Sequence, residues 1–388
     1  KTMTSVTAGK YAIGQENYAG TLGRNEISIV VNNGGVINMT GSGSAGIIAN
    51  YGEIINNGLI SATGTNSIGI VSYNGSFAQN NNTVTVGEGG TGIYGENKRN
   101  ASYGNAKIEI ENKGLINTTA TAGATSYGIY ALNNDVSLTR ADSTIKLFAG
   151  SEINMSAQDG GVGVSAFKST LTNDGKITVG KNGIAVYADD SEININSGEI
   201  NLNGDNAVGF YLTNSQFNGN SGTINITGKN VVLFNLVNSS FTNNLAVNAA
   251  PGSTYVVGNL SNAVYTHSGT NTLLSNSVLL NGNNSAMLID STSNISSSST
   301  GVVVMLLDGR YGLPFPAGYS ADGENAGTIV LGNDSAAVYG KNGTRLKNSG
   351  SITLGSNSVG VYNVGASSET ENIGIITLGN NSTGLYQN

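Results

Sequence analysis

The sequence predicts an all-β protein built from stacked, repeated coils. Gly and Asn each supply 56 of the 388 residues, and both disfavour helix interiors. Hydrophobic residues make up 38% of the chain, many of them Ile and Val, which favour strands. Charged residues make up only 11%, whereas disordered chains combine high charge with low hydrophobicity. These observations exclude a mainly helical protein and a disordered one.

A repeated unit is clearest near the C-terminus. Residues 348–362 read NSGSITLGSNSVGVY, residues 372–386 read NIGIITLGNNSTGLY, and residues 325–339 read NAGTIVLGNDSAAVY. The unit is N-x-G-x-I-x-L-G-x-N-S-x-G-V-Y, followed by a variable polar stretch. Self-similarity at a fixed period of this size is typical of solenoids and other repeat architectures.

Two apolar positions of the unit continue through most of the chain. The first follows the N-x-G turn and is occupied by Ile37, Ile60, Val84, Ile116, Ile153, Ile177, Ile200, Ile224, Val247, Val278, Ile329, Ile352 and Ile376. Eight of the twelve spacings between these residues are 23 or 24. The second is occupied by Ile47, Ile70, Ile93, Ile129, Val164, Val186, Phe210, Leu233, Val256, Leu288, Val338, Val361 and Leu385. Two positions that keep one period indicate a true repeat.

Each unit contains about three short stretches of alternating apolar and polar residues, separated by turn residues. One unit is too small to bury its own apolar face, and stacking of identical units buries it. Leucine-rich repeats share the period, but their leucine pattern is absent here. The predicted fold is therefore a right-handed parallel β-helix, a solenoid of about 14 coils with inserted loops, in a single domain over residues 1–388. Asn residues at equivalent corners are expected to form hydrogen-bonded ladders along the stack: Asn173, Asn196, Asn220, Asn325, Asn348 and Asn372.

Four breaks in the period predict insertions, near residues 96–111, 131–150, 255–272 and 295–325. Function on a repeat scaffold usually lies in such insertions. The first insertion carries Lys98 and Arg99, and the fourth carries two of the three prolines. The candidate partner-binding residues are Arg310, Tyr311, Phe315, Tyr319, Lys98 and Arg99, because aromatic and Arg anchors suit recognition of another surface. The alternative is a loop that packs its own rings onto the solenoid.

An aromatic residue often follows the second apolar position. The residues are Tyr94, Tyr130, Tyr187, Tyr211, Phe234, Tyr339, Tyr362 and Tyr386. If the apolar position points inward, strand alternation places these rings outward as an aromatic stripe. Such a stripe can bind sugar rings or a protein partner, and it can also stabilise the stack itself. The sequence leaves both interpretations open.

The sequence argues against an enzyme and against a bound metal or cofactor. The chain has no Cys, which excludes a thiol nucleophile and a thiolate metal site, and only one His, His267. The tightest acidic cluster, at residues 189–192, lies in an ordinary corner, and no G-x-S-x-G motif occurs. A net charge of −7 argues against a nucleic-acid partner, which requires a basic surface. No apolar run is long enough to span a membrane as a helix.

Residues 327–339 and 350–362 resemble the passenger repeats of large fusobacterial autotransporter adhesins, the RadD-like group and its galactose-sensitive relatives. The similarity covers nearly all of the chain outside the insertions. It implies type V secretion and a β-helical passenger displayed at the cell surface. A C-terminal β-barrel would hold that passenger in the outer membrane. Neither that barrel nor a signal peptide is present in the sequence, so we expect a fragment of a longer chain. The absence of Cys agrees with secretion of this kind.

The resemblance implies an adhesin, with roles in cell adhesion, coaggregation and virulence. The expected partners are a host cell-surface protein receptor, a glycan such as a galactose-containing one, or other bacteria, bound through loops and ridges of the solenoid. No nucleic acid is expected, and the membrane is contacted only through the missing barrel. The first alternative is a passive spacer that presents a distal binding tip. The second is a lyase or hydrolase that acts on polysaccharides.

Overall fold

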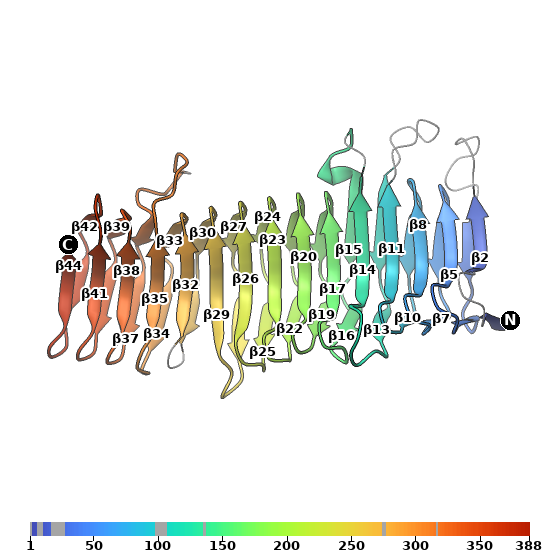
Figure 1. Ribbon diagram of the computed structural model, residues 1–388, viewed down its shortest axis with the longest axis horizontal. Coiled ribbons are helices and arrows are strands. Elements are labelled where there is room, and N and C mark those ends of the chain that lie inside the picture. Colours follow the sequence, from blue (N-terminus) through green and yellow to red (C-terminus); the bar gives the residue numbers. More distant parts are fainter. Residues whose placement is uncertain are drawn as a thin grey trace. The chain divides into compact units, whose positions relative to one another are not determined.

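The computed structural model describes residues 2–5, 11–16, 28–97, 107–134, 137–273, 277–315 and 317–388. It confirms the predicted fold class: short strands stack in parallel, each paired with the equivalent strand of a neighbouring coil (Figure 1). The coils number about 14. They fall into two compact units, which are described separately. Unit 1 holds residues 1–211 and 221–228, and unit 2 holds residues 212–220 and 229–388.

In unit 1 each coil contributes one strand to each of three faces, here called A, B and C. Face A consists of β1 (Thr2–Ser5), β4 (Val36–Met39), β7 (Leu59–Ala62), β10 (Thr83–Val86), β13 (Leu115–Thr118), β16 (Glu152–Met155), β19 (Lys176–Val179), β22 (Glu199–Leu202) and β25 (Thr223–Ile226). Face B consists of β2 (Tyr11–Glu16), β5 (Ala45–Asn50), β8 (Ile68–Tyr73), β11 (Thr91–Asn97), β14 (Tyr127–Asn133), β17 (Val162–Phe167), β20 (Ile184–Asp189) and the start of β23 (Val208–Thr213). Face C consists of β3 (Ser28–Val31), β6 (Glu53–Asn56), β9 (Phe77–Asn80), β12 (Ile108–Asn112), β15 (Ser143–Leu147), β18 (Thr170–Asn173) and β21 (Glu192–Ile195).

Unit 2 repeats the three faces with one interruption. Face B consists of β26 (Val231–Val237), β29 (Tyr255–Ser261), β32 (Val278–Asn283), β35 (Val303–Asp308), β38 (Ala336–Lys341), β41 (Val359–Val364) and β44 (Thr383–Gln387). Face C consists of β24 (Gln216–Gly219), β27 (Ser240–Asn243), β30 (Val264–His267), β33 (Ala286–Ile289), β36 (Gly323–Asn325), β39 (Arg345–Asn348) and β42 (Glu369–Asn372). Face A holds β28 (Ala246–Ala249) and, as a separate sheet, β31 (Thr270–Thr272), β34 (Asn294–Ser297), β37 (Thr328–Leu331), β40 (Ser351–Leu354) and β43 (Ile375–Thr377).

The core follows from alternation along each strand, which places every second side chain inside the coil. Ile116 pairs with Val84 on one side and with Ile153 on the other, and all three are fully buried. In unit 2, Ile329 pairs in the same way with Ile295 and Ile352. The first apolar position of the repeat is therefore an inward row of face A.

Both apolar rows were assigned wrongly in part of unit 2. Val278 belongs to β32 on face B, and the face-A row instead contains Asn271 and Ile295. On face B the inward row passes through Phe234, Gly258, Leu280 and Met305 rather than through Leu233, Val256 and Leu288. The hydrophobic pattern missed this register because Gly258 has no side chain and Asn271 is polar.

The predicted insertion at 255–272 is wrong, because these residues form the ordinary strands β29, β30 and β31. Among the described residues, segments longer than a simple corner connect β14 to β15 and β35 to β36, both where face B turns into face C (Figure 1). The first predicted insertion lies mostly outside the described residues. The fourth insertion is thereby narrowed from 295–325 to residues 309–322. The second is narrowed to residues 134–142, which include the 3₁₀ turn η3 (Arg140–Asp142).

The predicted Asn ladder is confirmed for Asn325, Asn348 and Asn372 on face C. The Asn325 side-chain amide donates to Asn348 Oδ1 at 2.8 Å, and the Asn348 amide donates to Asn372 Oδ1 at 2.7 Å. Unit 1 contains the same ladder at Asn56, Asn80 and Asn112. Asn196 and Asn220 do not belong to this row, because Ile195 and Gly219 occupy it. Along the part of the chain that the structure describes, no helix is long and apolar enough to cross a membrane.

Candidate functional site

The insertion 309–322 of unit 2 is tied to the solenoid by an ion pair whose carboxylate is buried and whose guanidinium is partly exposed. The Asp322 carboxylate is fully buried and accepts two hydrogen bonds from the Arg345 guanidinium, at 2.7 and 3.0 Å. It also accepts the backbone N–H groups of Tyr311 at 2.9 Å and of Arg345 at 2.7 Å. The bond to Asp322 raises the pKa of Arg345. This one carboxylate therefore joins the start of the insertion, its end and strand β39.

Arg310 also binds the solenoid itself. Its guanidinium donates to the backbone oxygens of Gly343 at 2.8 Å and Ser367 at 2.7 Å, and to the Glu369 carboxylate at 2.9 Å. Three partners thus hold the Arg310 head group. This geometry matches the alternative interpretation, in which the insertion packs against its own scaffold.

The aromatic side chains of the insertion are also packed inward. Tyr311 is buried and lies parallel to Phe315, with ring centroids 6.1 Å apart. The Arg345 guanidinium lies 4.3 Å from the centre of the Phe315 ring, a favourable cation–π arrangement. The Tyr319 hydroxyl lies 2.6 Å from the Thr266 hydroxyl on β30. Burial raises the pKa of Tyr319 to about 12, so this hydroxyl stays protonated at neutral pH. The four predicted residues of this insertion are brought together around one anchored loop.

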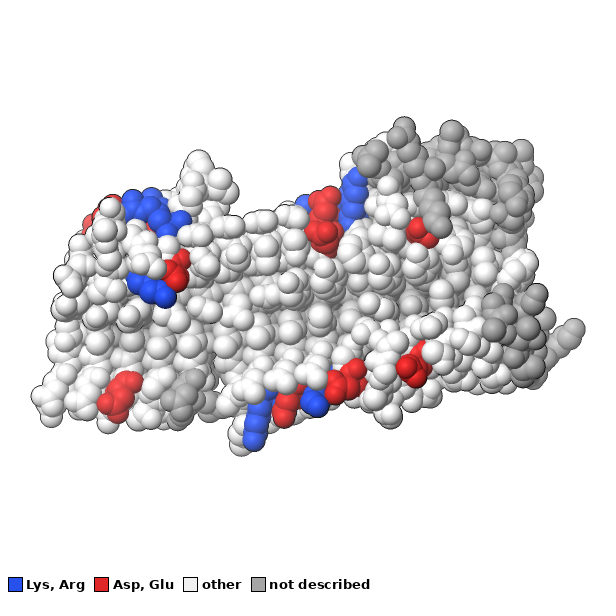
Figure 2. Space-filling model, in the orientation of Figure 1, with Lys and Arg blue, Asp and Glu red and all other residues white. Residues whose placement is uncertain are grey.

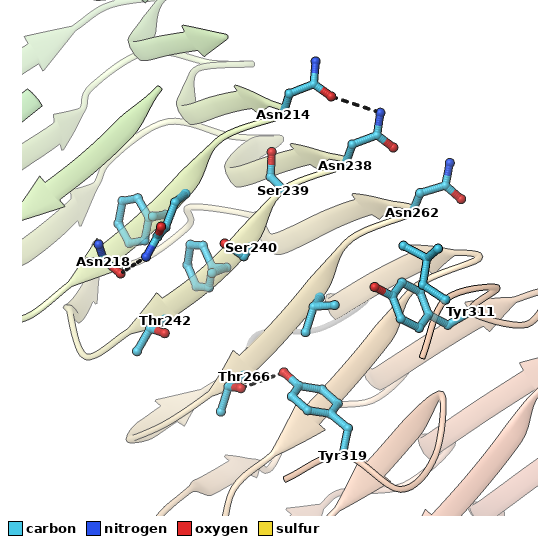
Figure 3. Close-up of a pocket in the computed structure, with 15 residues that line it drawn as sticks. Asn214, Asn218, Asn238, Ser239, Ser240, Thr242, Asn262, Thr266, Tyr311 and Tyr319 are labelled. Carbon is cyan, nitrogen blue, oxygen red and sulfur yellow. Dashed lines mark hydrogen bonds between the residues drawn. The ribbon is translucent and has the colours of Figure 1, made fainter. Parts of the chain in front are cut away.

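This anchored loop forms one wall of a groove of about 640 Å³ on face C (Figure 3). The floor comes from the outward side of β24, β27 and β30. The lining residues are Asn214, Gln216, Phe217, Asn218, Asn238, Ser239, Ser240, Phe241, Thr242, Asn262, Val264, Thr266, Tyr311, Leu313 and Tyr319. None of them is charged.

The groove combines three kinds of surface. Its floor presents hydroxyls and amides, as at Asn218 and Thr242, which can donate and accept hydrogen bonds. Along its side, the asparagines Asn214, Asn238 and Asn262 occupy successive corners, and the Asn238 amide donates to Asn214 at 3.3 Å (Figure 3). The loop wall contributes the rings of Tyr311 and Tyr319 and the exposed Leu313. Neutral hydrogen-bonding groups beside aromatic faces suit an uncharged polar ligand that also has an apolar side.

The corner asparagines are placed by backbone geometry. Asn214, Asn238 and Asn262 have φ angles of 49, 50 and 49°, in the left-handed region that Asn tolerates better than most residues. Each corner therefore repeats the same conformation, and the side chains line up along the stack. The local sequence thus gives the groove its regular edge.

The lining of the groove contains no charged side chain. On the face drawn in Figure 2, Lys, Arg, Asp and Glu occur in small groups with uncharged surface between them. Exposed ion pairs such as Lys341–Asp308, at 2.9 Å, account for part of them. Electrostatic attraction of a charged partner is therefore not the chemistry that this groove offers.

The aromatic stripe is divided between the two units. Tyr94, Tyr130, Tyr187 and Tyr211 are half-buried in the outward row of face B in unit 1, with stacked ring pairs 5.5 and 5.4 Å apart. In unit 2, Tyr339, Tyr362 and Tyr386 stack at 4.9 and 4.8 Å. Inclusion of Phe234 is wrong, because its ring is fully buried and Asn235 takes the outward position. The rings face outward but contact one another along the stack.

Lys98 and Arg99 lie outside the described residues. The single histidine, His267, is buried in the core of unit 2, where its ring is stacked on Tyr265 and its Nδ1 lies 3.2 Å from the Tyr265 hydroxyl. Burial lowers the pKa of His267 to about 4, so the ring is neutral at neutral pH. Of the acidic corner at 189–192, Asp190 pairs with Arg140 at 2.8 Å. Among the described residues, no group of three His, Cys, Asp or Glu side chains is placed to hold a metal ion.

The groove floor was missed at the sequence level. Residues such as Asn218, Ser240 and Thr242 are outward positions of ordinary coils, which the repeat pattern marks as scaffold. The available signal was the insertion's place in the unit: an insertion between face B and face C must lie beside the outward side of face C. Comparison with protein-family models, curated proteins and solved structures finds no match.

Proposed function

We propose that the chain is a binding solenoid of the adhesin type, displayed at a cell surface, and that the groove beside the insertion 309–322 is its recognition site. The site takes an uncharged polar ligand, for which a neutral glycan on a host cell or on another bacterium is the best match. A sugar ring presents hydroxyls at its rim and C–H groups on its face. These match the amides and hydroxyls of the floor and the tyrosines of the wall.

The observation that carries the proposal is the fixed position of the insertion 309–322, which forms one wall of the groove. A ligand site that is formed before binding avoids the entropy cost of ordering a loop. The pair of Arg345 with the buried Asp322 carboxylate and the Tyr319–Thr266 contact hold the insertion against face C. The groove volume of about 640 Å³ lies within the usual range for small-molecule sites, about 300–1,000 Å³.

The direct test fills the groove. Thr242 is an exposed outward residue of β27 in the groove floor, so Thr242→Trp places an indole in the site without touching the core. Thr172→Trp is the matched control, since Thr172 has the equivalent outward position on β18 in unit 1. We expect the wild-type chain and Thr172→Trp to bind a subset of neutral glycans on an array. Beads coated with either protein should also attach to cells. Thr242→Trp should lose both activities. Equal binding by all three proteins would refute the recognition role of the groove.

A passive spacer is the second candidate, and one observation favours it. Arg310, Tyr311 and Phe315, which the sequence marks for partner binding, are engaged with the solenoid itself. A loop of this kind can protect the stack where the coil is interrupted. The spacer function predicts that neither tryptophan variant changes glycan binding or cell attachment, so the same experiment separates the two candidates.

A further inference from the structure

Face A of unit 2 is interrupted between β28 and β31. Face-A strands elsewhere in the described units pair with the equivalent strand of the neighbouring coil, but β28 ends one sheet and β31 begins another. The Cα atoms of β28 and β31 lie for the most part more than 8 Å apart, whereas paired strands lie about 4.8 Å apart. A cleft of about 520 Å³ opens between them, lined by residues 244–248, residues 268–271 and Thr292. We call it the face-A cleft.

Both walls of the cleft present backbone hydrogen-bonding groups. The Gly269 carbonyl accepts the Asn294 N–H, and the Leu273 N–H donates to the Ser296 carbonyl. Alternate residues of segment 269–273 therefore bond to β34. In a parallel pair the intervening residue, Thr270, directs its N–H and C=O to the opposite side, into the cleft. On the other wall, Val247 has the position of Ile37, whose backbone groups face the following coil. No backbone hydrogen bond joins β28 to β31 among the described residues of unit 2.

The inward row marks the same place. Ile295, Ile329 and Ile352 in this row are fully buried, but Val247 is half-buried. The residue beside it is polar, since Asn271 stands where the other coils have Ile or Val. An apolar side chain presented from within the cleft would cover Val247. The chain thus leaves one apolar position and two strand edges open together.

From these observations we infer that the face-A cleft binds an extended segment of a partner polypeptide, which adds a strand between β28 and β31. A separation above 8 Å between most of their Cα atoms leaves room for one inserted strand, which would lie about 4.8 Å from each. The segment that fits alternates polar and apolar residues, so that one side faces Val247 and the other faces solvent. This site is independent of the groove on face C.

The test uses a fluorescent synthetic peptide that copies residues 348–355, NSGSITLG, which has the required alternation and includes β40. We expect saturable binding to the full chain by fluorescence anisotropy. Two versions of the peptide, N-methylated on one or the other set of alternate residues, should each bind at least about tenfold more weakly, because each loses the donors toward one wall. No saturable binding at about millimolar peptide, or N-methylated peptides that bind as tightly as the unmodified peptide, would overturn the inference.

A pair of protein variants provides the second arm. Thr270→Pro removes the N–H that faces the cleft, and Thr270→Val keeps it with a side chain of similar shape. Peptide affinity should fall about tenfold in the proline variant and stay within about twofold of wild type in the valine variant. Circular dichroism spectra and melting temperatures check that both variants are folded. Equal affinity of two folded variants contradicts the proposed strand addition, and the N-methylated peptides decide the matter if Thr270→Pro is unfolded.

Discussion

Two insertions that leave the solenoid at the same kind of corner are held in different ways. In unit 1, apart from the buried Leu138, residues 134–142 are fastened to the solenoid by partly exposed polar contacts: Arg140 pairs with Asp190, whose side chain is 53% exposed, and the Thr170 hydroxyl donates to the Arg140 carbonyl at 3.2 Å. In unit 2, residues 309–322 are fastened by Asp322, whose side chain is 0% exposed. Ring packing and the Tyr319–Thr266 contact reinforce this second attachment.

Burial of the fastening group decides whether an insertion is held in a fixed position. An exposed ion pair contributes little to stability, because water and salt screen it. A buried carboxylate with four hydrogen bonds fixes its neighbours, because leaving any partner unpaired inside the protein is costly. The insertion 309–322 is therefore expected to be ordered before a ligand arrives.

Asp322→Ala should be the most damaging substitution. It leaves Arg345 without its partner and releases both ends of the insertion, at a cost of about 3 kcal/mol in the free energy of unfolding of unit 2. Urea unfolding followed by circular dichroism measures the loss, and glycan binding should disappear with it. A loss below about 1 kcal/mol would show that the buried pair does not hold the loop.

His267 extends the comparison to the core. The inward row of face C contains Asn56, Asn80 and Asn112 in unit 1 and Asn325, Asn348 and Asn372 in unit 2, but at one rung of unit 2 it contains His267 next to Asn243. Burial holds the folded-state pKa of His267 at about 4, below the ordinary histidine value of 6.5. As the pH falls, the unfolded chain therefore binds the proton first.

The free energy of unfolding should therefore fall by up to about 3 kcal/mol between pH 6.5 and pH 4, with no further loss from this group at lower pH. His267→Asn, which restores the residue of the neighbouring rung, should remove this part of the pH dependence. Urea titrations of both proteins at several pH values provide the measurement. Parallel pH profiles would contradict the buried, neutral state of His267.

The outward row of face B offers a third contrast. Tyr130 stacks on Tyr94 in unit 1, whereas Asn259 occupies that row in unit 2 and bonds weakly to Asn281, at 3.3 Å. Tyr130→Ala should lower the free energy of unfolding by about 1–2 kcal/mol through lost stacking and burial. Asn259→Ala, the control, should change it by about 0.5 kcal/mol or less. If the two substitutions cost the same, the tyrosines do not form a stabilising ladder.

Asp190→Asn should have the smallest effect, because Asn tolerates the left-handed backbone of this corner, with a φ of 48°, and the substitution removes only the charge. Arg140, the partner of Asp190, is also partly exposed, so we expect a loss of about 0.5 kcal/mol or less, decreasing further as salt is added. Thermal melts at low and high salt check both statements. A loss as large as that of Asp322→Ala would remove the distinction between the two insertions.

The sequence was sufficient for the stacking but not for the site. Inward residues such as Ile116 and Ile352 recur because each coil must bury the same face, so a one-dimensional pattern reveals them. Asn271 and Gly258 break that pattern, so the pattern predicts the wrong register in their coils. Prediction of the groove would have required knowing which outward row the insertion packs against. Thr242 differs from Thr172 only because the insertion lies beside it.

Hydrogen–deuterium exchange of the ligand-free chain tests the preformed wall most directly. Peptides that cover residues 309–322 should exchange more slowly than peptides that cover residues 134–142, because the Tyr311 N–H donates to the buried Asp322 carboxylate and the Asp322 N–H donates to Arg345. Asp322→Asn should raise the exchange rate of the first segment and leave the second unchanged. Exchange of residues 309–322 as fast as that of residues 134–142 in the wild-type chain would contradict the account.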